Sequence, residues 1–137
     1  MSSTKIFVNL PVTDLEKSKE FYTKVGFSIN PQFTDETAAC VVISEEIYAM
    51  LLTHKKYNYF VKKEIADSNK TSEVINALST NSREKVDEMM EKVFAAGGKE
   101  IRDPEDYGWM YGRAYEDPDG HIWEIFWMDP AHIKEGK

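Results

Sequence analysis

Hydrophobic and polar positions near the start of the chain follow two different periods. From Lys5 to Val12 every second residue is apolar on one face, with Phe7 and Asn9 on the other, which predicts a β-strand. Beyond it, apolar residues recur at helical spacing until Gly26, a residue type that readily ends a helix. The chain is therefore predicted to open with a strand followed by a helix.

The predicted helix begins at a capping box. Thr13 followed by Glu16 is the pattern in which a hydroxyl accepts an early helix amide and the later carboxylate reaches back to the cap. After the helix, three apolar runs bounded by polar residues predict short strands at 27–33, 38–44 and 47–53. The first unit is thus predicted to be βαβββ.

The same order of elements begins again in the second half of the chain. A strand is predicted from Glu73 to Thr80, and then a helix that Asn81 or Ser82 caps and that ends at Gly97-Gly98. Further strands are predicted at 99–102, 110–116 and 121–128, the last two joined by the turn at 117–120. Aligning Phe7 with Ile75 also superposes the hydrophobic positions of the two helices, which indicates a duplicated unit.

These elements predict an α+β fold of two βαβββ modules in one domain, 1–137. Module one covers about 5–53 and module two about 73–128. The segment 54–72 between them is predicted to hold a short helix and a linker. A chain of 137 residues and 15.8 kDa has the usual size of one domain.

Charge and cysteine content restrict the partners. The net charge of −7 repels phosphate backbones and anionic membrane surfaces, so we expect neither nucleic acid nor membrane as a partner. Cys40 is the single cysteine and cannot form an internal disulfide, and the first ten residues lack the apolar run of a signal peptide. We therefore expect a cytoplasmic protein.

Three segments carry a resemblance to a known family. They are VNLPVTDLEKSKEFYTKVGF (8–27), AAGG (95–98) and YEDPDGHIWEIFW (115–127). Their order and spacing over 5–128 resemble the vicinal oxygen chelate (glyoxalase/bleomycin-resistance/dioxygenase) superfamily, in an uncharacterised branch similar to lactoylglutathione lyase. The resemblance implies two half-sheets that form a curved mixed sheet around a cleft. It also implies a small-molecule ligand or substrate and a homodimer that completes the cleft.

The same resemblance locates the positions at which metal-dependent members hold their ion. These positions correspond to Phe7, Leu51, Ile75 and Glu124, and only Glu124 offers a ligand atom. A divalent cation needs several converging oxygen or nitrogen donors. We therefore expect no metal and no other cofactor, and metal-dependent glyoxalase or dioxygenase chemistry is disfavoured. The three apolar positions are expected to line a ligand cleft instead.

Glu124 is the first candidate for a functional residue. The period of two along the last strand sets it on the face of Ile122 and Phe126, toward the expected cleft. There it can serve as an acid/base group or contact a ligand. The alternative is that a neighbouring arginine, tyrosine or amide holds it in a structural role.

Four other residues are candidate ligand contacts: Asn9, Trp109, Tyr111 and Arg113. Asn9 shares a face with Phe7, although its amide can equally bond to a neighbouring strand. The aromatic rings of Trp109 and Tyr111 can hold a planar ligand or join a dimer contact. Arg113 can pair with a ligand anion or with Glu124, or form a surface ion pair with Glu116 or Asp117.

Three functions follow as hypotheses. The first is a metal-free binding protein, similar to bleomycin-resistance members of the superfamily, for which an acidic chain suits a cationic drug. The second is a lyase or isomerase with Glu124 as acid/base, so enzymatic activity stays open. The third is an interaction module that uses Tyr57, Tyr59 and Phe60 as an exposed patch.

Overall fold

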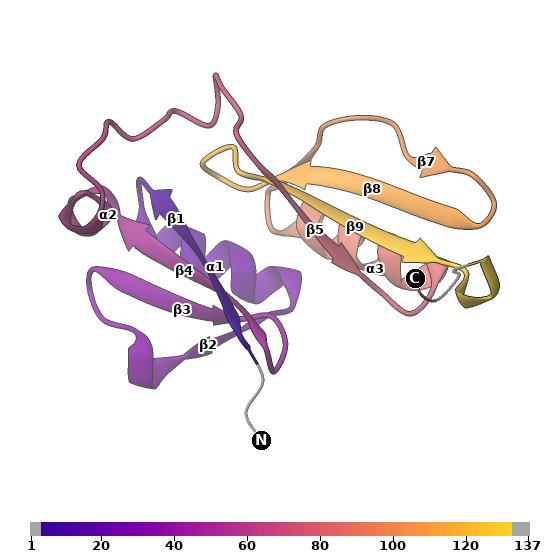
Figure 1. Cartoon of the computed structure of the whole chain (residues 1–137), viewed down its shortest axis with the longest axis horizontal. Coiled ribbons are helices and arrows are strands. Elements are labelled where there is room, and N and C mark those ends of the chain that lie inside the picture. Colours follow the sequence, from indigo (N-terminus) through magenta and orange to yellow (C-terminus); the bar gives the residue numbers. More distant parts are fainter. Residues whose placement is uncertain (1–3, 133–137) are drawn as a thin grey trace.

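The computed structural model describes residues 4–132 and contains two mixed sheets (Figure 1). The first sheet has the strand order β1 (Ile6–Val12), β4 (Ile47–Thr53), β3 (Ala38–Val42) and β2 (Ser28–Asn30). The second has the order β5 (Ile75–Ser79), β9 (Ile122–Met128), β8 (Met110–Glu116) and β6 (Lys99–Glu100). In each sheet the first two strands are parallel and the others antiparallel. The predicted α+β class and duplicated unit are confirmed.

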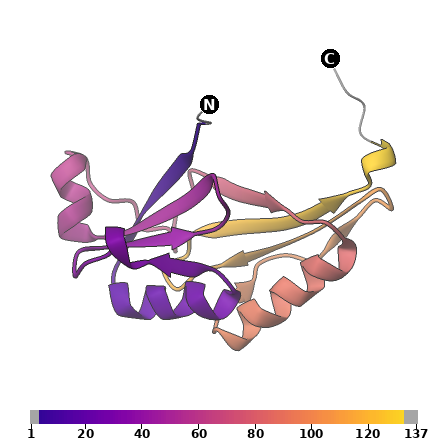
Figure 2. The same ribbon diagram turned by 90° about the horizontal axis from the view of Figure 1, so that it is seen from below.

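The two long helices cover the same side of the sheets. Figure 2 shows α1 (Leu15–Val25) and α3 (Arg83–Ala95) on one side, where they also pack against each other. We refer to this side of each sheet as the helix face and to the opposite side as the open face. Because side chains alternate along a strand, each strand residue belongs to one of these faces.

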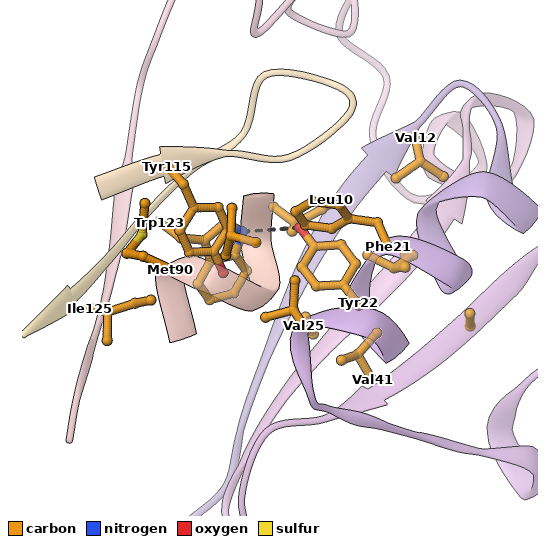
Figure 3. Close-up of a cluster of buried hydrophobic side chains, with 14 of the residues drawn as sticks. Leu10, Val12, Phe21, Tyr22, Val25, Val41, Met90, Tyr115, Trp123 and Ile125 are labelled. Carbon is orange, nitrogen blue, oxygen red and sulfur yellow. Dashed lines mark hydrogen bonds between the residues drawn. The ribbon is translucent and has the colours of Figure 1, made fainter. Parts of the chain in front are cut away.

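The buried core lies between the helix faces and the helices. Its largest fully buried side chains come from both modules, with Phe21 and Tyr22 on α1 and Tyr115 and Trp123 on the second sheet (Figure 3). The Trp123 indole N–H donates to the Tyr22 hydroxyl (3.0 Å), which in turn donates to Asp117 (2.5 Å). Buried polar groups need such partners, and here the partners join the two modules.

The beginning of α1 differs from the prediction. Asp14, not Thr13, is the N-cap, since its carboxylate accepts from the Lys17 N–H (3.1 Å). The backbone N–H and the hydroxyl of Thr13 instead donate to the Asp119 carboxylate (3.0 and 2.9 Å). Thr13 is therefore engaged by the turn of module two and is not available to cap the helix.

Several other elements also differ from the prediction. The strand predicted at 27–33 ends at Asn30, because Pro31 has no N–H to donate and a 3-10 turn, η1 (Pro31–Phe33), follows. A short strand, β7 (Glu105–Asp106), was not predicted and pairs with β8. The short helix expected between the modules is α2 (His54–Phe60), and a last 3-10 turn is η2 (Pro130–His132). The helices of residues 4–132 are all too short or too polar to cross a membrane.

Candidate functional site

Glu124 lies on the open face of the second sheet, as predicted. Its register partners are Ala77 on β5 and Ala114 on β8. One carboxylate oxygen, Oε2, accepts a hydrogen bond from Arg102 Nη2 (2.7 Å). The two side chains are 27% and 32% exposed, so the pair is partly screened from water. Arg102 is therefore the neighbouring arginine that contacts Glu124.

Sequence reasoning missed Arg102, and the fold explains how it reaches Glu124. Pairing of β6 with β8 continues through the Ile101 N–H, which donates to the Ala114 carbonyl (3.2 Å). Arg102 follows in a loop and extends past β8 to β9. The residue between them on β8 is Ala114, whose methyl group leaves room for a long side chain to pass. No local sequence pattern predicts this contact, because the contact depends on which strands pair in the sheet.

The Arg102 guanidinium has unused hydrogen-bond donors. Within residues 4–132 its only hydrogen bond is the one to Glu124, and its Nε is buried without a partner. A guanidinium carries five N–H donors, so several remain for a ligand. Glu124 likewise keeps its second oxygen. The pair can therefore offer both a donor and an acceptor on the open face.

Phe7 and Ile75 also lie on open faces, Phe7 on that of the first sheet and Ile75 on that of the second. Phe7 is 46% exposed and stacks on Tyr48 of β4 (4.6 Å between ring centroids, 9° between planes). Ile75 is 52% exposed and lies two residues along β5 from the register partner of Glu124. The structure brings Ile75 and Glu124 onto one sheet and leaves Phe7 on the other.

The prediction for Leu51 is wrong. Leu51 is fully buried in the core, where the register of β4 with β1 pairs it with Leu10 on the helix face. The open-face positions of β4 are Tyr48 and Met50, which pair with Phe7 and Asn9. A shift of one residue along a strand moves a side chain to the other face.

The predictions for Tyr111 and Arg113 are wrong for the same reason. Both lie on the helix face of β8, opposite to the face of Glu124. Arg113 binds both carboxylate oxygens of Glu100 (2.8 and 2.9 Å) and also Asp87 (2.9 Å), which accepts from the Tyr111 hydroxyl too (2.7 Å). Hydrogen bonds from Arg113 lower the pKa of Glu100 although desolvation opposes the shift. This cluster is a structural tie between β8, β6 and α3.

Trp109 lies away from Glu124, at the far end of the β8–β9 hairpin. Its ring stacks on His132 (4.2 Å between centroids) and lies beside Tyr107 (6.0 Å). Trp109 is five positions along the chain from Ala114, the register partner of Glu124, which corresponds to about 17 Å of extended chain. Trp109 therefore belongs to an aromatic cluster of its own and does not contact the ion pair.

Asn9 lies in a crevice between the modules. Its Nδ2 donates to the Phe7 carbonyl (3.1 Å), and the residue lines a cavity of about 380 Å³ together with β5 and the segment after α2. Neither Glu124 nor Arg102 lines this cavity. Asn9 thus lies beside Phe7 on the first sheet and apart from the Arg102–Glu124 pair on the second.

Cys40 and His121 have the structural roles that their positions indicate. Cys40 is a free, buried thiol on β3, and burial raises its pKa. His121 directly precedes β9 and bonds through its two ring nitrogens to Ser68 (3.2 Å) and to the Pro11 carbonyl (2.7 Å). Neither residue lies beside Glu124 in the register of its sheet.

The donors at the expected metal positions do not fit a divalent ion. Phe7 and Ile75 have no ligand atom, Leu51 is in the core, and Arg102 already occupies Glu124. Across residues 4–132 there is no group of three or more His, Cys, Asp or Glu side chains that could hold a metal. A cation beside the Arg102 guanidinium would also meet charge repulsion.

Comparison with known proteins finds one family match and several structural relatives. Residues 4–44 match the family described as bleomycin resistance protein-like N-terminal. The search of curated proteins found no match. A hypothetical protein from S. aureus is 30% identical over 92% of this chain and 95% of its own, with a TM-score of 0.76.

Two more distant structures share the fold. A glyoxalase/bleomycin resistance protein/dioxygenase family enzyme from Burkholderia phytofirmans is 18% identical, covers 92% of this chain and 99% of its own, and has a TM-score of 0.78. The bleomycin resistance determinant encoded on the transposon Tn5 is 20% identical, covers 93% of this chain and 99% of its own, and has a TM-score of 0.65. Together with the family match over residues 4–44, these structures show that the chain has the fold of the glyoxalase/bleomycin resistance/dioxygenase superfamily.

Proposed function

We propose that the protein binds a small organic molecule between the open faces of two copies of the chain. The observation that carries the proposal is the Arg102–Glu124 ion pair on a mostly apolar and accessible sheet face. Exposed apolar surface rimmed by a few polar groups is typical of binding sites. The pair supplies those polar groups, and Ile75 and Phe126 on the same face supply the apolar surface.

A second copy is part of the proposal because one chain divides the candidate residues between two sheets. Phe7 and Tyr48 form an exposed aromatic stack on the first sheet, and the ion pair lies on the second. Placing the stack of one copy over the ion pair of another encloses a cleft with an aromatic wall and a polar floor. Such enclosure removes the apolar side chains from water, which favours association.

The ligand of this proposal is an organic molecule that carries a hydrogen-bonding group and a cationic group. The likeness to the Tn5 bleomycin resistance determinant supports a drug-like ligand. The net charge of −7 attracts cations over a distance of about a Debye length. Binding in this manner needs no metal, in keeping with the donor set at the site.

Binding is favoured over the lyase or isomerase alternative by the groups around Glu124. Its neighbours on the open face are Ala77, Ala114 and Phe126, none of which can transfer a proton. A reaction that moves a proton between two positions would rest on Glu124 alone, and Arg102 engages one of its oxygens. We also propose that the protein acts in the reducing cytoplasm, where the thiol of Cys40 stays free.

The test combines native mass spectrometry with a calorimetric titration of bleomycin. We expect freshly purified protein to appear as a dimer that carries an organic adduct, which is lost when the protein is denatured. Glu124→Gln is expected to weaken bleomycin binding about tenfold, the effect of losing one charge-assisted hydrogen bond. Glu91→Gln is the matched control, because it removes the same charge from an exposed position on α3.

Each measurement has an outcome that contradicts the proposal. A monomer without adduct that does not bind bleomycin would refute it, and so would equal binding by the two variants. A stoichiometric metal would overturn the donor argument. Turnover that disappears in Glu124→Gln while binding persists would move the assignment to the lyase or isomerase alternative.

A further inference from the structure

The crevice between the two modules is separate from the open-face site. It has a volume of about 380 Å³, within the range that holds small organic molecules. One wall is β1 at residues 8–11, and the other is formed by 74, 76 and 120–122 at the start of β5 and β9. The segment 61–74 closes it on a third side. Because the Arg102–Glu124 pair does not line it, an occupant of the crevice leaves that pair free.

Hydrogen bonds fix the segment that closes the crevice on its third side. The Pro11 carbonyl can only accept, so His121 Nε2 carries the proton that it receives, and Nδ1 accepts from the Ser68 hydroxyl. His121 thereby ties the segment 61–74 to β1. Ser68 also packs directly on Gly120, where an added Cβ would lie 2.8 Å from the Ser68 carbonyl oxygen. The third side of the crevice is therefore fixed in place, which lowers the entropy cost of binding.

The two walls each carry an asparagine. Asn9 projects from β1 and Asn76 from β5, and both line the cavity. Within residues 4–132 the Asn76 side chain has no hydrogen-bond partner, and Asn9 uses only its Nδ2. The hydroxyl of Tyr57, which also lines the crevice, has no partner there either. Unused donors and acceptors thus face the same space.

This chemistry selects an uncharged ligand. An asparagine side chain presents a donor beside an acceptor and pairs best with a ligand edge that does the same. The charged residues of the lining, Lys63, Glu64 and Glu73, are all exposed and stay solvated. An ionic ligand would lose its hydration without gaining a buried counter-charge.

We propose that this crevice is a second binding site, for a small uncharged molecule with a primary or cyclic amide. The amide N–H and carbonyl of the ligand bond to Asn9 and Asn76, and its apolar part contacts Val61 and Ile65. The site is independent of the proposed open-face function. Variants at Glu124 are therefore expected to leave it unchanged.

The test is an NMR titration of nitrogen-15-labelled protein with nicotinamide, benzamide and pyrrolidinone. Each compound is compared with its fully N-methylated counterpart, which has no amide N–H: the N,N-dimethyl amides of nicotinamide and benzamide, and N-methylpyrrolidinone. We expect at least one of the three amides to shift the side-chain amide signals of Asn9 and Asn76 with saturation. Its N-methylated counterpart is expected to bind about tenfold more weakly or not at all.

Variants then localise the effect. Asn76→Ala is expected to abolish the saturable shift of the Asn9 signal, whereas Ser79→Ala, an exposed change on the same strand, and Glu124→Gln preserve it. The proposal is overturned if none of the amides shifts both signals, or if N-methylation leaves the affinity unchanged. If Asn76→Ala does not fold, the comparison of each amide with its N-methylated counterpart on the unaltered protein decides alone.

Discussion

Two buried tyrosines make a matched pair for testing the polar core. The Tyr22 hydroxyl donates to Asp117 (2.5 Å) and accepts from the Trp123 indole N–H (3.0 Å). The Tyr115 hydroxyl is also buried but has no hydrogen-bond partner in residues 4–132. Burial raises the pKa of both phenols, so each stays protonated at neutral pH. Replacing either residue by Phe removes one oxygen and little else.

The same substitution is expected to have opposite consequences at the two sites. Tyr22→Phe removes a hydrogen bond to a carboxylate and leaves the buried Trp123 N–H unsatisfied, so we expect a loss of about 2–4 kcal/mol in the free energy of unfolding. That loss is large against the roughly 5–15 kcal/mol that stabilises an ordinary domain. Tyr115→Phe removes a polar group that was already unsatisfied, and we expect no loss or a gain of up to about 1 kcal/mol.

Urea denaturation followed by tryptophan fluorescence measures both variants. A shift of the midpoint with an unchanged slope would show that stability, not the denatured state, has changed. The reasoning is refuted if Tyr22→Phe unfolds within about 0.5 kcal/mol of the unaltered protein, since its hydroxyl would then contribute nothing. It is equally refuted if Tyr115→Phe costs more than about 1 kcal/mol.

Two further predictions concern the linker and the acid range. Gly120→Ala is expected to lower the free energy of unfolding by about 2–4 kcal/mol, measured by heat or urea, because Gly120 combines a φ of +88° with the close approach of Ser68. Gly108 has a similar φ of +83° but open space around it, so Gly108→Ala is expected to lower it by only about 1–2 kcal/mol. Equal losses in the two glycine variants would contradict the packing argument. Arg113 lowers the pKa of Glu100, so the stability from this pair is present above the unfolded pKa of about 4.3 and disappears as the pH falls through the folded value. Arg113→Gln is therefore expected to flatten the acid limb of a plot of unfolding free energy against pH, and an unchanged limb would show that the pair does not contribute.

The position of Arg113 shows what the sequence could and could not predict. The hairpin of β8 and β9 follows from its turn residues, and the strand period sets Glu124 on the open face. A turn over 117–120 would also place Arg113 opposite Glu124. In the structure the N–H of the turn's first residue bonds to the His121 carbonyl (3.0 Å), so the connection is one residue longer, the register shifts by one, and Ala114 lies opposite Glu124 instead. A single residue of register thus moves two candidate ligand contacts to the other face.

Leu51 illustrates a different limit. Strand β4 is apolar at every position from Ile47 to Leu52, so no alternation distinguishes its faces. Only pairing with β1 settles the question, and that pairing joins segments about forty residues apart. The helices and the repeat were predictable because their signals are local and periodic. The contact from Arg102 to Glu124 was not predictable, because it crosses β8 and depends on the pairing of β6 with β8, for which the sequence carries no local signal.

That contact also changes how the open face can select a ligand. A carboxylate alone on an apolar face would pay for desolvation and would attract a cation directly. With Arg102 bound to it, Glu124 presents a nearly neutral pair, so short-range selection depends on hydrogen bonding and on the apolar surface that a second copy contributes. The net charge of −7 then acts mainly at longer range, where it raises the encounter rate of a cationic ligand without fixing its orientation. In the proposed site, attraction and recognition are therefore separate, and salt is expected to slow association more than it weakens the final complex.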